Sequence, residues 1–377
     1  MSFVLPTTDL AAAGLRPEPI ARMEKLIEQH IAEGRYPGAQ VAIARRGKLA
    51  YSRNYGLARI APAVPARDET LWRLYSNTKV ITAAAIWVLV EDGLLSFSDR
   101  VAEHLPDFAR NGKGAITIFQ VLTHQAGFPN APVMPPESWE DHQLLKRLVC
   151  DYTLEWTPGS RLHYHSYSAH WVLALIIEAL TKMDFRAFIR SRVIEPLGLG
   201  AEMFVGMGNE DQTRCAEMYE PAADGKTQKL IEAENTVAFR RAGVPSGGGF
   251  ATARAMAAFY QALLAGGALG ERRILSPRMV QYVTRNFTGE RPDEAMGGIP
   301  MHRGLGPHSR GTSEVTRGLG SLAHPNVFGH GGVGSSYCWA DPESGMSFAY
   351  ISNSKYPDPW HSRRLELISN CVHAAIV

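Results

Sequence analysis

A serine and a lysine three residues apart are the first residues in this sequence that could do chemistry together. The segment reads Tyr75-Ser76-Asn77-Thr78-Lys79 and directly precedes an apolar stretch with helical spacing. On a helix, positions i and i+3 share a face, so the Lys79 amine can reach the Ser76 hydroxyl. A serine hydroxyl becomes a good nucleophile when a neighbouring base takes its proton, and burial favours the neutral lysine that can be this base. The positive end of the helix dipole would also favour an oxyanion at this serine.

The same S-x-x-K pattern occurs a second time, and its context is different. Ser352 ends a predicted strand and leads through Lys355 into a proline-containing turn, so no helix would place that lysine over the serine. Ser76 instead opens a helix of several turns. The alternative for Ser76 is a helix N-cap without a catalytic role.

Two later motifs could join the first. A Pro158-Gly159 turn leads to Tyr164 at the mouth of an apolar helix, and a phenol near a lysine can act as a base or proton relay. The segment 329–334 is rich in glycine and enters a strand, which permits the close approach of a ligand. The Val333 N–H could then join the Ser76 N–H as an oxyanion donor. Taken singly, Tyr164 is more often a half-buried packing residue, and the glycine segment is better explained as a plain turn.

The elements that must position these residues follow from the hydrophobic periodicity. Apolar spacing and turn signals predict helices over 18–32, 167–180 and 360–375, and strands over 40–44, 49–53, 336–340 and 346–351. Residues from about 70 to 222 are mainly helical in this prediction, and the Gly/Pro-rich stretch 297–320 is an ordered surface loop near a pocket.

This order of elements predicts an α/β fold in which an antiparallel sheet is flanked by helices and carries an inserted, mainly helical domain. We expect a discontinuous sheet domain formed by residues 1–66 and 230–377, and a helical domain formed by residues 67–229. The active site would lie at their interface.

Composition excludes several classes of function. Among 377 residues, the formal net charge is +2 and no long basic run occurs, so nucleic acid is not an expected partner. The four cysteines are far apart, which argues against a disulfide framework or a zinc ribbon, and no H-E-x-x-H occurs. We expect no metal and no cofactor. No signal peptide or membrane span is visible, so the expectation is a cytoplasmic protein of open oligomeric state.

The three motifs, in this order and spacing, resemble the serine β-lactamase and penicillin-binding-protein superfamily. The resemblance covers nearly the whole chain and is greatest to the class C-like branch, which includes the family VIII carboxylesterases. Further matching segments are 122–128, 158–178 and 246–250. The resemblance implies that Ser76 is the acylated nucleophile, that Lys79 and Tyr164 are paired bases, and that Ser76 and Val333 supply the oxyanion hole.

Two departures from the family pattern favour an ester over a lactam as substrate. The middle motif is Tyr164-His165-Ser166 instead of Tyr-x-Asn, and the asparagine normally helps to hold an amide. His330 stands where the lactamases carry the lysine of Lys-Thr-Gly, which helps to bind a carboxylate. We therefore predict a carboxylesterase for short acyl chains. The predicted pocket residues are His330, Gly331, Gly332, Ser166, His165, Phe128 and Trp156.

Several alternatives keep the same catalytic group. An amidase or D-aminopeptidase, a β-lactamase and an acyl transferase would differ only in the pocket or the acceptor. A catalytically silent binding homologue is the alternative from another class, although such a protein would be expected to lose one of the three reactive side chains. An ordinary α/β-hydrolase is not expected because no Gly-x-Ser-x-Gly elbow occurs.

Overall fold

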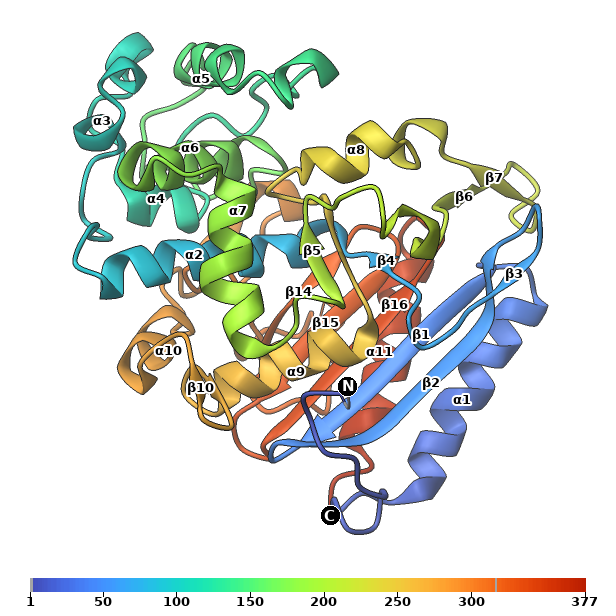
Figure 1. The fold of residues 1–377 in the computed structure, drawn as a ribbon. Helices are drawn as coiled ribbons and strands as arrows, with labels where there is room; N and C mark the ends of the chain where they lie inside the picture. The colour runs from blue at the N-terminus through green and yellow to red at the C-terminus, as the bar shows by residue number, and fades with distance from the viewer. Residues whose placement is uncertain (1–2, 316) are drawn as a thin grey trace.

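A seven-stranded antiparallel sheet forms the centre of the structure, a computed structural model that describes residues 3–315 and 317–377 (Figure 1). Its strands are β1 (Gly38–Arg45), β2 (Lys48–Arg59), β3 (Val64–Pro65), β13 (His308–Ser309), β14 (Phe328–Gly332), β15 (Ser336–Asp341) and β16 (Met346–Ser352). The spatial order is β13-β14-β15-β16-β1-β2-β3. Strands from distant parts of the sequence therefore meet at the junction of β16 and β1, where Ala39 lies opposite Ser352.

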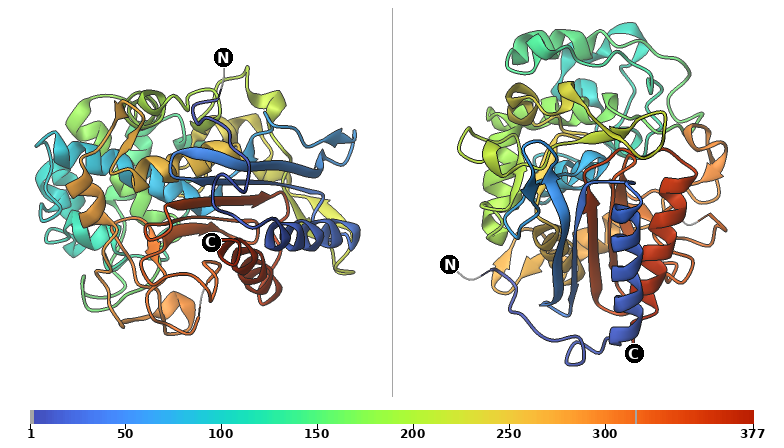
Figure 2. Two further views of the ribbon diagram at one scale, coloured as in Figure 1. Left: turned by 90° about the horizontal axis from the view of Figure 1, so that it is seen from below. Right: turned by 90° about the vertical axis from the view of Figure 1, so that its right-hand side faces the viewer.

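Each face of this sheet is covered by helices. Helices α1 (Pro17–Ala32) and α11 (Trp360–His373) run side by side over one face, as the right view of Figure 2 shows, and α9 (Ala253–Leu264) covers the other. Side chains of a strand alternate between the faces. Val41 accordingly belongs to the apolar cluster under α1 and α11, whereas Ala42 belongs to the cluster under α9.

The middle of the chain forms a helical layer beside the sheet (Figure 1). Its helices are α2 (Thr78–Glu91), α3 (Val101–His104), α4 (Ile118–Leu122), α5 (His142–Cys150), α6 (Ser168–Thr181) and α7 (Phe185–Ile189). Residues 78–89 of α2 and 168–177 of α6 are all buried, as expected for helices that are apolar on every side. These two helices pack against each other, and α2 follows directly on the turn that contains Ser76.

Short elements complete the fold. A three-stranded sheet joins β4 (Trp72–Arg73), β8 (Gly249–Ala251) and β5 (Met203–Val205). The others are α8 (Val237–Ala242), α10 (Pro277–Val283), β6 (Tyr219–Pro221), β7 (Gln228–Leu230), β9 (Ala268–Leu269), β10 (Arg272–Arg273), β11 (Pro292–Asp293) and β12 (Ile299–Pro300). Because β8 pairs with β4 and β5, hydrogen bonds cross the predicted domain boundary, and the division at residues 67 and 229 stays a prediction.

The predicted fold class and the long elements are confirmed, with ends shifted by one to a few residues. One prediction is wrong: residues 301–309 are buried and do not form a surface loop. They are held inside because Arg303 forms an ion pair with buried Asp293, and because Trp87 Nε1 donates a hydrogen bond to the Leu305 carbonyl at 2.9 Å. In the described residues, no helix is long and apolar enough to cross a membrane.

Candidate active site

Ser76 lies in a short 3-10 turn, Tyr75–Asn77, that leads directly into α2. The turn begins with a strained residue, since Tyr75 has a φ of 46°. A non-glycine residue in this region costs about 1 kcal/mol or more, and such strain persists only where the surroundings hold it. The turn leaves Ser76 half-buried at the edge of a pocket.

The Glu234 carboxylate contacts the strained turn and the charged residues around it. It accepts a hydrogen bond from the Tyr75 hydroxyl and forms ion pairs with Arg73 at 2.5 Å and with Lys355 Nζ at 3.4 Å. The Arg73 guanidinium also lies 4.0 Å from the centre of the Tyr75 ring. Lys355 belongs to the second S-x-x-K pattern, whose Ser352 hydroxyl donates to a backbone carbonyl instead. The second pattern therefore does not pair its serine with its lysine.

Lys79 is fully buried, and three oxygens surround its amine. Nζ lies 3.2 Å from Ser76 Oγ, 2.8 Å from the Ser166 carbonyl oxygen and 3.0 Å from the Ser246 carbonyl oxygen. Burial, with the nearby Arg303 charge as a second cause, holds the pKa of Lys79 well below its usual range. A neutral amine has two N–H groups and one lone pair, and carbonyls can only accept. If both N–H groups serve the carbonyls, the lone pair faces the Ser76 hydroxyl, as a general base requires.

Tyr164 places its phenol oxygen in the same pocket, enclosed and without a hydrogen-bond partner among the described residues. The Lys79 amine lies 5.0 Å from the centre of its ring and the Arg303 guanidinium lies 4.8 Å from it. Burial raises the pKa of Tyr164 above its usual value, while the Ser76 hydroxyl and the Arg303 charge act in the opposite direction. The phenol is therefore protonated at neutral pH and can donate a proton.

A buried ion pair that the sequence did not reveal positions Tyr164. Asp293 Oδ1 accepts the Tyr164 backbone N–H at 3.2 Å, and its Oδ2 accepts Arg303 Nε at 3.0 Å. Both side chains are almost completely buried. Arg303 also donates from Nη1 to His308 Nε2 at 2.8 Å. The only signal in the sequence is an aspartate and an arginine ten positions apart, of which only Arg303 falls in the predicted loop 297–320, and such a signal has no specificity.

The end of β14 approaches the nucleophile turn very closely. A Cβ atom at Gly332 would lie 2.6 Å from the Leu74 carbonyl oxygen and 2.3 Å from Ser336 Oγ, so only glycine fits. The next residue, Val333, lines the pocket together with Ser76. Within 3–315 and 317–377, neither the Val333 N–H nor the Ser76 N–H donates to another protein oxygen. Both are thus free to receive an oxyanion.

The pocket that contains Ser76 has a volume of about 270 Å³. The predicted residues His330, Gly331 and Gly332 line it, with Val333 and Tyr164. Apolar side chains form much of the remaining wall: Met296, Met301, Tyr337 and Leu365. His361 and Ser362 from the first turn of α11 also line the pocket, together with Asp358 just before that helix. Arg317 contributes a positive charge.

Four predicted pocket residues do not line it. Phe128 is fully buried in the core, and His165 is fully buried with its ring nitrogens next to the His163 carbonyl and the Phe128 N–H. Trp156 packs instead against His163 and Arg161 at the Pro-Gly turn. The Ser166 side chain is exposed, and only its carbonyl contributes, by accepting from Lys79. The structure places Tyr164 in the pocket wall, whereas its neighbours in the motif do not line the pocket.

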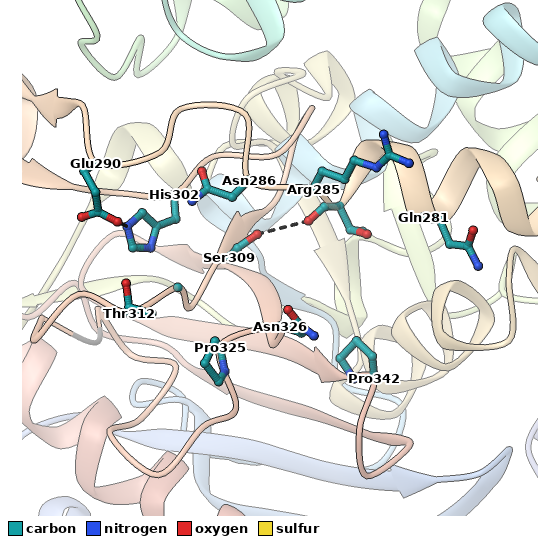
Figure 3. A pocket seen from close by; sticks show the side chains of 12 residues that line it. Gln281, Arg285, Asn286, Glu290, His302, Ser309, Thr312, Pro325, Asn326 and Pro342 are labelled. Carbon is teal, nitrogen blue, oxygen red and sulfur yellow. Dashed lines mark hydrogen bonds and ion pairs between the residues drawn. The ribbon is translucent and has the colours of Figure 1, made fainter.

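A second pocket of about 440 Å³ lies away from Ser76 and contains none of the predicted residues (Figure 3). Polar groups line it, including Gln281, Asn286 and Asn326. His302 lies at one end, 3.1 Å from a Glu290 carboxylate that is largely exposed. No catalytic grouping like that of Ser76 and Lys79 occurs among the residues that line it.

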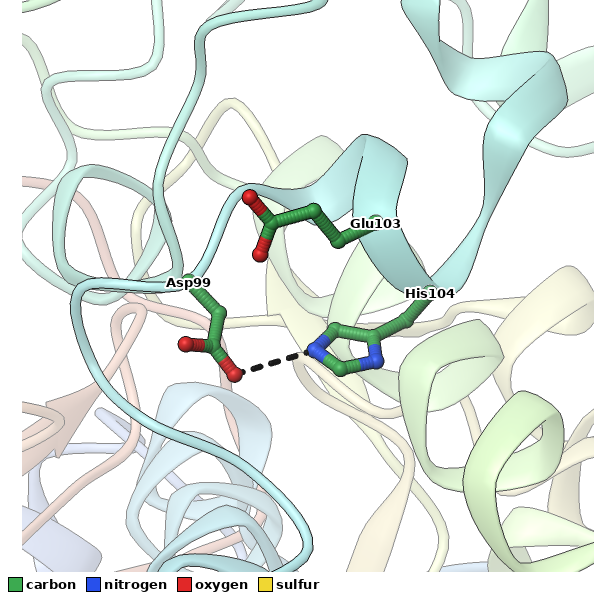
Figure 4. Close-up of side chains that lie close together, drawn as sticks. All are labelled: Asp99, Glu103 and His104. Carbon is green, nitrogen blue, oxygen red and sulfur yellow. Dashed lines mark hydrogen bonds and ion pairs between the residues drawn. The ribbon is translucent and has the colours of Figure 1, made fainter.

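Two carboxylate and histidine clusters bring possible metal-ligating atoms together in the described residues, and both lie outside the Ser76 pocket. In the first, Asp99 forms an ion pair with His104 at 3.1 Å near Glu103 (Figure 4). In the second, both ring nitrogens of His142 already have protein partners, Glu178 and the Trp139 carbonyl. Local ion pairing accounts for both clusters.

Comparisons with known proteins agree with this geometry. The Beta-lactamase family matches residues 23–370. The "Esterase/beta-lactamase LipL" of Mycobacterium tuberculosis is 29% identical over 347 residues, which cover 85% of this chain and 77% of LipL. A solved penicillin-binding protein homologue from Caulobacter crescentus is 28% identical with a TM-score of 0.80. A solved family VIII carboxylesterase is 26% identical, also with a TM-score of 0.80, and each of these two matches covers 95% of this chain and 99% of the other.

Proposed function

The chain belongs to the Beta-lactamase family of serine hydrolases, and on that basis we propose that it is a carboxylesterase that acts through an acyl-enzyme on Ser76. One observation carries the proposal: the buried Lys79 amine lies 3.2 Å from Ser76 Oγ, while two backbone carbonyls accept its N–H groups. A buried, neutral lysine in this position can take the serine proton. The proposed substrate is a small ester with a short, uncharged acyl chain.

In the proposed acylation step, Lys79 takes the proton of Ser76 as Oγ attacks the ester carbonyl. The negative charge that develops on the carbonyl oxygen is held by the backbone N–H groups of Ser76 and Val333. Such preorganised donors stabilise the transition state more than the ground state, because the full charge exists only there. The C–O bond then breaks, and the alcohol leaves.

The leaving alkoxide needs a proton, and Tyr164 is the group placed to give it. Its phenol is protonated at neutral pH and has no competing partner. Lys79, now protonated, restores the phenol proton, which returns the pair to its starting state. Deacylation follows with water in place of Ser76 as the nucleophile. The water oxygen attacks the acyl-enzyme while one of its protons passes to the Tyr164 and Lys79 pair. The bond to Ser76 Oγ then breaks, and the pair returns a proton to Ser76.

Two features support an ester over a lactam or a peptide. The position that would supply a lysine charge is occupied by His330, and burial lowers the pKa of that imidazole to about 3, so it is neutral. The position of the family's amide-holding asparagine is occupied by Ser166, whose side chain is exposed and points away from the pocket. An ester needs neither group, since its alkoxide leaves more readily than an amine.

The proposal is tested by the hydrolysis of p-nitrophenyl butyrate, with nitrocefin assayed in parallel. Ser76→Ala should abolish ester turnover, whereas Ser352→Ala, which alters the other S-x-x-K serine, should retain it. A fluorophosphonate probe should label the wild type and Ser352→Ala but not Ser76→Ala. Fast nitrocefin cleavage would instead assign the protein to the β-lactamases. Labelling without turnover of either substrate would point to an amidase or an acyl transferase, and no labelling would indicate a silent homologue.

A further inference from the structure

Two buried imidazoles beside Ser76 each have a ring nitrogen without a partner. His330 on β14 and His308 on β13 lie with their ring centres 4.1 Å apart, and both line the Ser76 pocket. Among the described residues, neither His330 Nε2 nor His308 Nδ1 forms a hydrogen bond. A buried polar atom without a partner is destabilising, and in a pocket wall it indicates a group that a ligand completes.

The hydrogen bonds of His330 fix which of its nitrogens carries the proton. Nδ1 lies 2.8 Å from the Gly331 carbonyl oxygen, and a carbonyl can only accept. Nδ1 is therefore the donor. Since the ring is neutral, its unpartnered Nε2 is a bare lone pair, which is an acceptor only.

The opposite tautomer holds for His308. Its Nε2 faces Arg303 Nη1 at 2.8 Å, and a guanidinium can only donate, so Nε2 is the acceptor. Arg303 is itself fixed by its ion pair with Asp293. Burial holds the pKa of His308 well below its usual range, so the ring is neutral and its unpartnered Nδ1 carries a proton. This nitrogen is a donor only.

The pocket wall therefore offers one acceptor and one donor from adjacent rings. A carboxylate cannot donate to His330, and an ammonium group cannot accept from His308. A hydroxyl does both through a single oxygen. The same pocket wall includes the apolar side chains of Met301 and Leu365 and the charged side chains of Arg317 and Asp358.

We propose that His308 and His330 form a subsite for a hydroxyl group on the acyl portion of the substrate, so that the enzyme prefers hydroxyacyl esters. This inference rests on the proposed esterase function. In the complex, the substrate hydroxyl donates to His330 Nε2 and accepts from His308 Nδ1. The subsite involves no covalent step, because the two imidazoles act only as hydrogen-bonding groups.

The test compares three p-nitrophenyl esters of nearly equal shape: 3-hydroxybutyrate, 3-methylbutyrate and 3-aminobutyrate. We expect kcat/KM for the hydroxy ester to exceed that for the methyl ester by about tenfold, since a site built for a hydroxyl discriminates against the analogue that lacks it. The ammonium ester should be the poorest of the three. In an apolar pocket without this subsite, kcat/KM would be higher for the 3-methylbutyrate ester than for the 3-hydroxybutyrate ester. That result would overturn the proposal.

Two variants assign the preference to these residues. His330→Met removes the acceptor and His308→Phe removes the donor, and in each the ratio of hydroxy to methyl ester should fall to about one or below. A ratio that stays near the wild-type value in both variants would also overturn the subsite. If neither variant folds, the comparison of the three esters with the wild type still decides. Hydrolysis of all three esters without preference for the hydroxyl refutes the subsite alone, whereas no hydrolysis of any ester refutes the esterase.

Discussion

The buried histidines make the stability of this protein depend steeply on pH below 6.5. Burial is the largest cause that lowers the pKa of each member of this group: His30, His124, His165, His170, His308, His330, His361 and His373. The values fall to about 4 for His30 and about 3 for His165 and His330. At pH 5 the rings with the lowest values, His165 and His330, are neutral in the folded protein, whereas in the unfolded chain they are protonated.

The sign of the effect follows from proton binding. Below pH 6.5 the unfolded chain binds more protons than the folded protein, so the free energy of unfolding falls as the pH falls. Each fully neutral histidine contributes about 1.4 kcal/mol per pH unit, or about 2 kcal/mol between pH 6.5 and pH 5. A few such residues together match the 5–15 kcal/mol of net stability typical of a domain. His142, whose pKa is raised by the hydrogen bond that its ring donates to the Glu178 carboxylate, acts in the opposite direction but is a single residue.

The measurement is urea unfolding followed by tryptophan fluorescence at pH 7.5, 6.5, 5.5 and 5.0. We expect the midpoint to change little from pH 7.5 to 6.5 and then to drop sharply. His170→Gln should flatten the dependence by about 1.4 kcal/mol per pH unit, because neither His170 ring nitrogen has a protein partner among the described residues. His324→Gln, at an exposed histidine, is the matched control. A midpoint that stays constant down to pH 5 would refute the reasoning.

Three substitutions test the catalytic turn. Lys79→Met should lower kcat for p-nitrophenyl butyrate by 10²- to 10⁴-fold, as loss of a general base does. Gly332→Ala should lower kcat and also destabilise the fold, because the added methyl collides with the Leu74 carbonyl and displaces the oxyanion donor. Glu234→Gln should lower kcat more than it changes KM, since it weakens the ion pairs that hold Tyr75 in its strained conformation. Stopped assays over a range of substrate concentrations measure all three.

One control variant and two contradicting outcomes complete these predictions. Gly114→Ala should leave kcat unchanged, because a methyl there meets only ordinary van der Waals contacts. Retention of the wild-type kcat by the Gly332→Ala variant would contradict a displaced oxyanion donor. An unchanged kcat in Glu234→Gln would mean that the turn does not depend on this carboxylate.

Local spacing accounts for the part of the site that could be predicted. Ser76 and Lys79 are neighbours on one helix, so their contact follows from helical geometry alone, and the family pattern added Tyr164 and Val333. The rest depends on contacts between distant segments. His308 comes next to His330 only because β13 pairs with β14, and Arg303 lies behind Tyr164 and His308 because its guanidinium pairs with buried Asp293.

The errors in the pocket have the same origin. Phe128 and His165 are close in sequence to motif residues, but proximity in sequence does not decide which way a side chain points from an irregular loop. Both side chains turn into the core, where the His165 ring accepts the Phe128 N–H. The fold was easier to predict, since the apolar runs that form β15, β16 and α6 are properties of single segments.

The pairing of β1 with β16 sets the order in which the protein can be completed during synthesis. The β1–β2 hairpin emerges early from the ribosome, but the partner on its other edge, from Met346 to Ser352, is made almost last. Until then β1, whose residues are all buried in the folded protein, exposes an unpaired edge, and such an edge is a template for association with other chains. Nascent chains that stall before β16 should therefore depend on chaperones, whereas the finished chain closes this edge itself.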